Sequence, residues 1–373
     1  MSNVFVVDGK ELKEALDRVV LTVPVGELTH YGFVFGKKAV KLVAMDSDRV
    51  ASVVLTPKRF KGEGEFFFAD AVTLKTAVNG RDEVTIEFTH DKIVFSAGRF
   101  KGDLKRSEPG ASALADLKLG SSIDTDSSIA IDKDFFGSLG DGVKVARLKD
   151  PYNDNYIPSA TIVYDGKYLT VMGNDDYHLH IYKRKIKSKT APLKLTIPIG
   201  IFSILDRIIK DDAKFFITDE RLFIRGKNIT VSLPPIDTEV NLEQIENFLA
   251  GLKKPIKSFT IGSDFATAFQ NIAGYFKKGV SSLLIKTNKD RIQLHYQNDG
   301  GSIEDVVKVK DAKGSEFSAQ IDPVIFEDSY KNIRGCKKIE FSVYPNKQGD
   351  PACYKMETEF SDGVLVAYGY FKE

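Results

Sequence analysis

The sequence of 373 residues predicts an α+β protein made of three similar domains, each a doubled β-α-β-β-β unit. Three patterns predict this class: a long internal repeat, an amphipathic helix early in each copy, and a hairpin after each helix. Strands containing Val7, Ile131 and Ile261 align at spacings of 124 and 130 residues. Solenoid units recur every ~20–50 residues, so a repeat this long is a whole domain. We expect domains at residues 1–122, 123–252 and 253–373.

The first helix of each copy is expected from apolar residues at helical spacing. The first copy has Leu12, Ala15, Leu16, Val19 and Val20, and the third has Phe265, Ala268, Phe269, Ile272, Ala273 and Phe276. The second copy keeps Phe135, Leu139 and Val143, but three glycines among them lower its helix propensity. A hairpin follows in each copy, and Val40, Leu169 and Ile292 keep the register of the repeat. The turn Asp165-Gly166 is the strongest hairpin signal of the three.

Each copy closes with a second strand, helix and hairpin. The expected helices begin near Ala71, Ile201 and Val324, and Pro198 and Pro323 precede the latter two. The expected strand pairs are 84–88 with 93–96, 214–217 with 221–225, and 339–343 with a partner near 356–360. Residues 101–127 and 234–257 have the composition of linkers.

Composition limits the possible functions. Lys plus Arg is 53 and Asp plus Glu is 52, so a nucleic-acid binder of this composition must segregate its charge onto one surface. Two cysteines make no disulfide framework. The sequence has no apolar signal segment after Met1 and no run of ~18 apolar residues, which favours a cytoplasmic protein without a membrane span.

Three local stretches carry a resemblance to a known family. They are Leu42 to Ala51 after the first hairpin, Met172 to Leu179 after the second, and Leu294 to Asn298 followed by Glu304-Asp305 after the third. With the threefold repeat and the total length, they resemble the bacterial-type DNA polymerase sliding clamp, a processivity factor, over essentially the whole chain. The match at 172–179 keeps only Asp175 and Leu179, so the resemblance is to a divergent clamp, and a viral or otherwise remote source fits this divergence.

The resemblance implies a fold and a function. Two chains would join head to tail into a homodimeric ring, with sheets outside and helices lining a hole for duplex DNA. The ring would tether a DNA polymerase and meet a clamp loader, without catalysis, cofactor or metal of its own. It would work in the cytoplasm at the nucleoid, or in the host cytoplasm if the chain is viral.

The repeat independently selects cations for the inner surface. Thirteen residues after Phe68, Ile197 and Ile321 stand Arg81, Lys210 and Arg334. Ten residues after the same three stand Val78, Arg207 and Lys331. Further candidates are Lys75, Arg147, Lys149, Lys277 and Lys278. The alternative is that cations at these helix ends only complement the helix dipole, or that they are solvated surface charges.

The family's partner-peptide pocket, carried over by position, gives a second set of candidates. It comprises Asn174, Tyr177, His178, Leu179, Val366, Tyr368, Tyr370 and Phe371. The family usually ends in a Met-Pro-Met-Arg-like segment, which this chain replaces with aromatic residues. Alternatively, Leu179 and Val366 are ordinary core residues.

Two other functions stay open at this point. Asp175, Asp176, His178 and His180 form a metal-like cluster, because two histidines two apart on a strand share a face. That cluster favours a metal-dependent hydrolase on a repeated β-rich frame. The first copy has no histidine at the aligned stretch, which argues against it. A structural module on the same frame is the third possibility.

Overall fold

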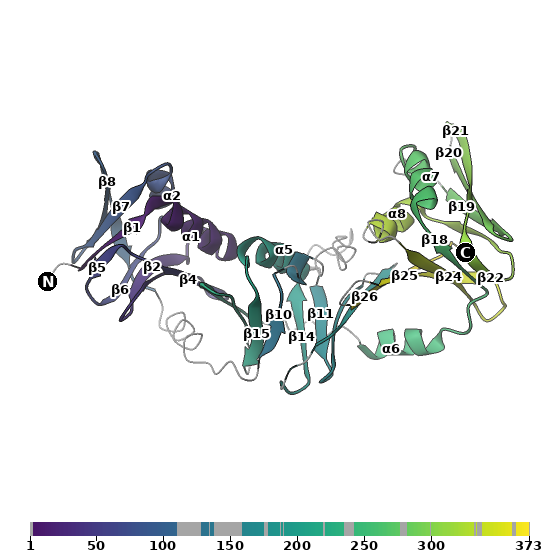
Figure 1. Cartoon of the computed structure of the whole chain (residues 1–373), viewed down its shortest axis with the longest axis horizontal. Coiled ribbons are helices and arrows are strands. Elements are labelled where there is room, and N and C mark those ends of the chain that lie inside the picture. Colours follow the sequence, from purple (N-terminus) through teal and green to yellow (C-terminus); the bar gives the residue numbers. More distant parts are fainter. Residues whose placement is uncertain are drawn as a thin grey trace. The chain divides into compact units, whose positions relative to one another are not determined.

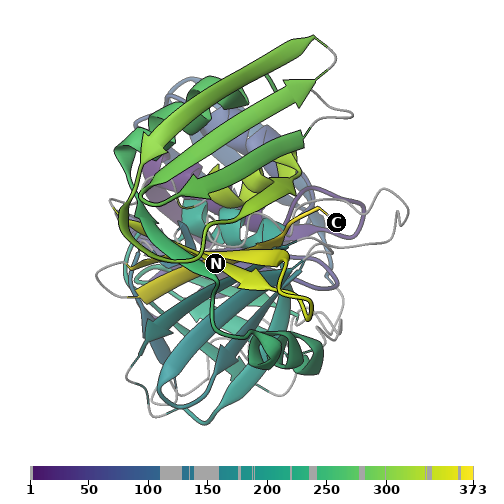
Figure 2. The same ribbon diagram turned by 90° about the vertical axis from the view of Figure 1, so that its right-hand side faces the viewer.

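The computed structural model describes residues 3–109, 128–133, 135–137, 159–174, 178–186, 188, 190–218, 221–234, 242–276, 282–298, 300–331, 333, 338–359 and 363–372. The chain divides into two compact units. Unit 1 comprises Met1–Phe136, Ser188–Ala191 and Ile201–Pro235, and unit 2 comprises Gly137–Lys187, Pro192–Gly200 and Ile236–Glu373. Helix α5 (Ile199–Ile208) crosses the boundary between them. Figures 1 and 2 show the chain in two views.

Unit 1 holds a 13-stranded sheet. The strands from the first copy are β1 (Asn3–Asp8), β2 (His30–Phe35), β3 (Val40–Met45), β4 (Val50–Leu55), β5 (Arg59–Lys61), β6 (Gly64–Phe68), β7 (Glu83–Phe88), β8 (Lys92–Ala97) and β9 (Phe100–Ser107). The strands from the second copy are β10 (Ile129–Ile131), β15 (Ala213–Thr218), β16 (Arg221–Arg225) and β17 (Ile229–Leu233). Their order is β10-β15-β16-β17-β4-β3-β2-β6-β9-β8-β7-β1-β5, so strands of two copies share one sheet.

The helices of the first copy are fixed by caps and by burial. Helix α1 (Gly9–Thr22) begins after Asp8, whose carboxylate accepts from the backbone amides of Lys10 and Glu11. Helix α2 (Ala71–Val78) begins after Asp70, which accepts from Thr73 N at 2.8 Å. The two helices pack against each other, as Figure 1 shows, and the predicted positions Leu12, Leu16 and Val19 are fully buried.

Unit 2 holds two sheets. The nine-stranded sheet contains β11 (Ser159–Tyr164), β12 (Tyr168–Asn174), β13 (His178–Lys185), β14 (Leu193–Pro198), β18 (Lys257–Ile261), β22 (Lys310–Gly314), β24 (Ile339–Pro345), β25 (Pro351–Glu359) and β26 (Gly363–Tyr370). Its order is β14-β11-β12-β13-β26-β25-β24-β18-β22. The four-stranded sheet contains β19 (Ser282–Asn288), β20 (Arg291–Asn298), β21 (Gly301–Lys308) and β23 (Ser318–Ile321), in the order β21-β20-β19-β23.

The helices of unit 2 are α6 (Leu242–Gly251), α7 (Ser263–Ala273) and α8 (Pro323–Lys331). An aromatic core joins α7 and α8: the ring of Phe326 lies 5.2 Å from Phe269 and 5.4 Å from Tyr354. Helix α6 lies on the other side of the nine-stranded sheet from α7 and α8 (Figure 1). No helix within the described ranges is long and apolar enough to cross a membrane.

The predicted helices α1, α2, α5, α7 and α8 and the predicted hairpins are confirmed where the structure describes them. In the second copy, only residues 135–137 of the expected first helix lie within the described ranges. The pairing of Phe341 with Met356 confirms the last strand pair. The boundaries 1–122, 123–252 and 253–373 stay a prediction.

Both linker predictions are wrong in part. Residues 101–107 belong to β9, whose exposed, charged side chains hid the strand pattern because the strand has only one buried face at Leu104. Residues 242–251 form α6, because Leu242, Ile245, Phe248 and Leu249 follow helical spacing and pack on the sheet. Residue 257 already belongs to β18.

Candidate DNA and partner contact surfaces

Strands of neighbouring copies pair at two junctions with the same register. In unit 1, β17 pairs with β4, and Val231 lies opposite Ala51. In unit 2, β26 pairs with β13, and Ala367 lies opposite His180. When the copies are superposed strand by strand, following the residue pairs within each sheet, Val231 takes the position of Ala367. Ala51 takes the position of His180 in the same way. The last strand of one copy therefore joins the third hairpin strand of the copy before it, twice.

In the described part of the chain, two strands of this kind are open on one side over most or all of their length. The third strand of the third copy, β21, has one neighbour, β20. The last strand of the first copy, β9, pairs with β8 along its length and with β6 only at Arg106 and Ser107. Phe100 begins β9 and is 38% exposed, whereas its equivalents Ile229 and Leu365 are 3% and 2% exposed. Phe100 thus has the position of a residue that a neighbouring strand buries.

The two edges carry opposite charges. Lys101 and Lys105 are exposed on β9, together with one acidic residue, Asp103. Strand β21 carries Glu304, which is exposed, and the half-buried Asp305, together with one basic residue at its end, Lys308. Glu304 lies 3.5 Å from Nδ1 of His295 on β20.

The predicted inner-surface cations lie at different kinds of position. Arg207 and Lys210 are exposed near the end of α5, on the side away from its buried residues Phe202, Leu205 and Ile208. Lys210 Nζ donates to Asp206 O at 3.3 Å. These two side chains are therefore available to an anion approaching α5.

Arg81 and Lys75 of the first copy are engaged within the protein. Arg81 stands three residues beyond the end of α2, and its guanidinium lies 5.3 Å from the ring centre of Phe100. Lys75 Nζ lies 2.5 Å from Asp17 Oδ1, and Lys13 Nζ lies 3.1 Å from Asp17 Oδ2. Burial raises the pKa of Asp17, but the hydrogen bonds from Lys75 and Lys13 outweigh it and leave the pKa below its usual value.

The remaining cations of the prediction are not located. Arg147, Lys149, Lys277, Lys278 and Arg334 lie outside the described residues, and so does the side chain of Lys331. The inner-surface assignment of the whole set stays a prediction.

The predicted peptide-pocket residues divide between two faces of the sheet formed by β12, β13 and β26. Leu179, Val366 and Tyr368 contact one apolar cluster on the face that α6 covers. His178 and Phe371 lie on the opposite face, where His178 Nε2 is 3.0 Å from Ile325 O of α8 and Phe371 contacts Tyr354. Asn174 is half-buried opposite Leu179, and Tyr177 lies outside the described residues. The Tyr370 ring lies 5.9 Å from Phe248, which packs on the same cluster. The structure therefore brings together four of the eight predicted residues on this face: Leu179, Val366, Tyr368 and Tyr370.

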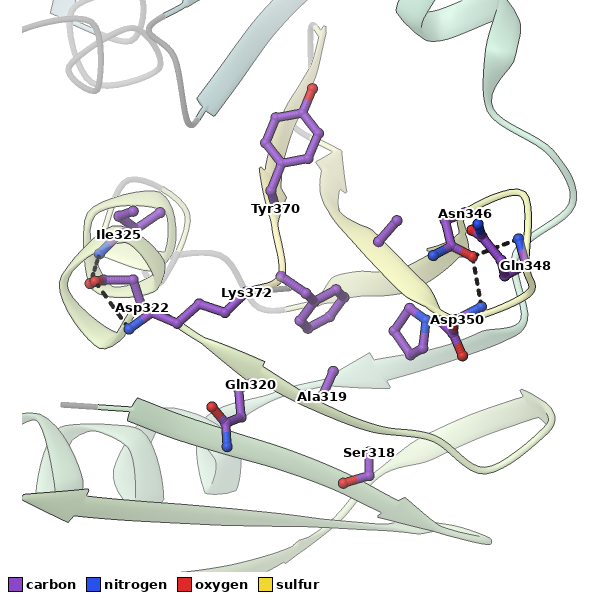
Figure 3. A pocket seen from close by; sticks show the side chains of 13 residues that line it. Ser318, Ala319, Gln320, Asp322, Ile325, Asn346, Gln348, Asp350, Tyr370 and Lys372 are labelled. Carbon is purple, nitrogen blue, oxygen red and sulfur yellow. Dashed lines mark hydrogen bonds and ion pairs between the residues drawn. The ribbon is translucent and has the colours of Figure 1, made fainter. Parts of the chain in front are cut away.

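A groove of 1520 Å³ lies beside the C-terminal strand and joins segments far apart in the sequence (Figure 3). Its lining residues are Ser318, Ala319, Gln320, Asp322, Ile325, Asn346, Gln348, Asp350, Pro351, Ala352, Tyr370, Phe371 and Lys372. Tyr370 is 47% exposed, and partial burial raises its pKa. The Asp322 carboxylate accepts from the first amides of α8 and lies 3.6 Å from Lys372 Nζ. The groove offers aromatic surface together with both signs of charge.

Sequence reasoning found only Tyr370 and Phe371 among the groove residues. The others come from three segments that no spacing pattern connects, so only the tertiary structure reveals them. The helix that covers the apolar face could have been predicted from the sequence, because Leu242, Ile245 and Phe248 follow helical spacing.

The groups considered for catalysis do not form a metal centre within the described ranges. No cluster of three His, Cys, Asp or Glu side chains suited to a metal occurs there, and Asp175 and Asp176 lie outside them. His178 and His180 are both buried, and their rings are 6.3 Å apart. Burial raises the pKa of the Cys353 thiol to about 12, which disfavours the thiolate that a nucleophile needs.

Comparison with known proteins places the fold. No protein-family model and no curated protein sequence matches the chain. Among solved structures, the DNA polymerase sliding clamp of Bacillus subtilis matches with a TM-score of 0.82 at 15% identity, over 100% of both chains. The DNA polymerase III subunit beta of Pseudomonas aeruginosa gives 0.80 at 14%, over 99% of this chain and 100% of that one. The Helicobacter pylori beta clamp, bound to a DNA ligase peptide, gives 0.76 at 14% with the same coverage. The chain therefore has the fold of the bacterial DNA polymerase sliding clamps over its full length.

Proposed function

We propose that this chain is a sliding clamp: two copies close head to tail into a ring around duplex DNA and tether a DNA polymerase for processive synthesis. The observation that carries the proposal is the junction register. The chain joins its copies twice through a last strand and a third hairpin strand. In its described part, β21 remains at a sheet edge, and residues 100–105 of β9 are open on the side away from β8. A second chain supplies the partner for both edges, and two such contacts close a ring.

The repeat also supports a register for this contact. Gly102 is equivalent to Val231 and Ala367, and Ile303 is equivalent to Ala51 and His180. By the same rule, Gly102 of one chain lies opposite Ile303 of the other. Lys101 then lies opposite Glu304, and Phe100 opposite Asp305. This places the basic edge against the acidic one and covers the exposed ring of Phe100.

DNA would be held by enclosure, without sequence reading and without catalysis. Phosphate contacts carry no sequence information, so exposed cations such as Arg207 and Lys210 suffice to centre the duplex. A net charge of +1 suits a ring that must slide and not grip. The metal-dependent hydrolase and the structural module have no comparable support, since the full-length similarity is to clamps.

The polymerase and a clamp loader would dock through short peptides. The groove beside Tyr370 and Phe371 and the apolar surface at Leu179, Val366 and Tyr368 are the candidate sites. The Helicobacter pylori clamp with a bound ligase peptide supports this mode of docking. Such a protein would act where DNA is replicated, in the cytoplasm at the nucleoid, or in the host cytoplasm if the chain is viral.

A covalently closed ring tests the proposal without a loader. The double variant Phe100→Cys, Asp305→Cys, in a Cys336→Ser background, is mixed with nicked circular DNA and then oxidised. We expect disulfide-linked dimers that stay on the circle in high salt and are released when a restriction enzyme linearises it. The Phe100→Cys single variant is the control. Equal retention on circular and linear DNA, or no disulfide between the two positions, would contradict the proposal.

A further inference from the structure

Helix α6 covers an apolar surface at the junction of β13 and β26. Ile245 is its most deeply buried residue, 7% exposed, and it packs with Met172, Leu179 and Tyr368, which are 7–9% exposed. The helix also places the Phe248 ring 5.6 Å from Tyr368 and 5.9 Å from Tyr370. Leu242, Phe248, Leu249 and Leu252 pack partly buried around this cluster. Figure 2 shows α6 beside this part of the sheet.

The equivalent surface in unit 1 has a different character. There the cluster is Val43, Met45, Val50 and Phe67, but the positions equivalent to Val366 and Tyr368 are Thr230 and Ser232. Arg221 donates to Ser232 Oγ at 2.7 Å and to Asp48 O at 2.7 Å. The surface at the β4–β17 pair therefore carries polar groups, whereas the surface at the β13–β26 pair under α6 is apolar and aromatic.

The attachment of α6 to this surface depends on side chains. The backbone groups of β12, β13 and β26 pair with neighbouring strands. Only one of the ten helix residues, Ile245, is buried, and residues 252–256 after the helix belong to no regular element. Isolated helices shorter than ~12–15 residues are marginal in water, so α6 needs the sheet to stay helical. Release and unwinding of α6 would therefore occur together.

We propose that α6 is a displaceable internal occupant of a docking surface, and that a partner segment with apolar side chains at similar spacing binds there by replacing it. The inference rests on the proposed function only for the existence of such partners. The bound segment would contact Leu179, Val366 and Tyr368, with Tyr370 linking this surface to the groove of Figure 3. Binding in the free chain is weakened by competition from α6, because a tethered segment has a high effective concentration.

The chain supplies its own probe. A labelled synthetic peptide of residues 240–253 is titrated, by fluorescence anisotropy, into the full-length protein and into an Ile245→Asp, Phe248→Asp variant that weakens the internal helix. We expect the variant to bind the peptide at least ~10-fold more tightly than the unmodified protein, because the competing segment is removed. Asn247→Ala, on the exposed face of α6, is the matched control and should behave as the unmodified protein. A peptide carrying the same two Asp substitutions should not bind.

Hydrogen exchange on the unmodified protein gives a second measurement that does not depend on any variant folding. We expect the α6 amides to exchange much faster than those of β13 and β26. Equal peptide affinities for the variant and the unmodified protein, or α6 protection equal to that of β26, would overturn the inference. Neither assay contains DNA, so failure of the ring proposal and failure of this one are distinguishable.

Discussion

Exchanging the charges at the proposed ring contact should make two chains that form dimers with each other much more tightly than with themselves. In a Lys101→Glu chain, the introduced carboxylate faces Glu304 at both contacts, and in a Glu304→Lys chain the introduced ammonium faces Lys101. When the two variants are mixed one to one, one contact of the mixed dimer pairs the two introduced side chains, which have opposite charges. The other contact keeps Lys101 with Glu304. The repeat therefore predicts weak homodimers and a restored heterodimer.

The size of the effect follows from cross-strand pairing. An opposite-charge pair across two strands contributes about 0.2–1 kcal/mol, and like charges opposite each other are unfavourable. Changing attraction to repulsion costs about 1–2 kcal/mol per contact by this scale. Two contacts give about 2–4 kcal/mol, or roughly 30- to 1000-fold in the dimer dissociation constant.

Sedimentation velocity and native mass spectrometry measure the outcome at low salt. Lys105→Glu is the matched control: Lys105 shares β9 and the same face, but its register partner is Gly300, which bears no charge. Salt near 1 M should reduce the difference between variants, because it shortens the screening length to ~3 Å. Unchanged homodimers, or a statistical mixture of homo- and heterodimers, would refute the register.

Three further predictions concern stability and DNA. Phe326→Ala should lower the free energy of unfolding, measured by urea denaturation, by about 3–5 kcal/mol, because Phe326 is fully buried among aromatic rings. Val324→Ala, at an exposed position of the same helix, should change it little. Asp70→Ala should cost about 0.5–2 kcal/mol as a lost helix cap. Hydrogen bonds from Thr73 lower the pKa of Asp70, so the ionised carboxylate stabilises the fold above its ordinary pKa of 3.8. This contribution to stability is lost as the pH falls through the lower pKa of the folded state. Asp70→Asn keeps the cap and should remove this pH dependence from the melting temperature. Arg207→Glu with Lys210→Glu should weaken retention on DNA and reduce the salt slope by about 2, while Lys37→Glu with Lys38→Glu, in an exposed turn, should not.

A substitution of Arg81 tests more than DNA contact, unlike substitutions of Arg207 and Lys210. The sequence selected Arg81 and Lys210 as equivalent cations, but the structure places the Arg81 guanidinium on Phe100 at the proposed ring contact. Arg81→Glu would therefore change both DNA retention and dimer formation. A dimer measurement must accompany any such variant.

The sequence was informative wherever the repeat tested the same pattern three times. Helices α1 and α7 follow from apolar residues at helical spacing, and the burial of Leu12, Phe265 and Ile272 matches the pattern. Strand β9 was missed because an edge strand with exposed Lys101, Asp103 and Lys105 has no second buried face. Its length and neighbours are set by pairing with β8, which is a tertiary interaction.

The candidate sites were harder to predict than the fold. A sequence motif places Leu179 and His178 side by side, whereas strand geometry sends their side chains to opposite faces of the sheet. Tyr368 was found by position, and its overall burial raises the pKa of its hydroxyl to about 12. Its contact with Phe248, however, depends on a helix from a segment with linker composition. The groove beside Tyr370 needs α8 and the β24–β25 turn, which no local pattern connects.

Electron cryomicroscopy of the purified protein, at a concentration above its dimer dissociation constant, tests the ring most directly. We predict closed particles of two chains around an opening wide enough for duplex DNA, with β9 of each chain paired to β21 of the other and Lys101 opposite Glu304. Single chains at every concentration, or a dimer joined through any other edge, would contradict it.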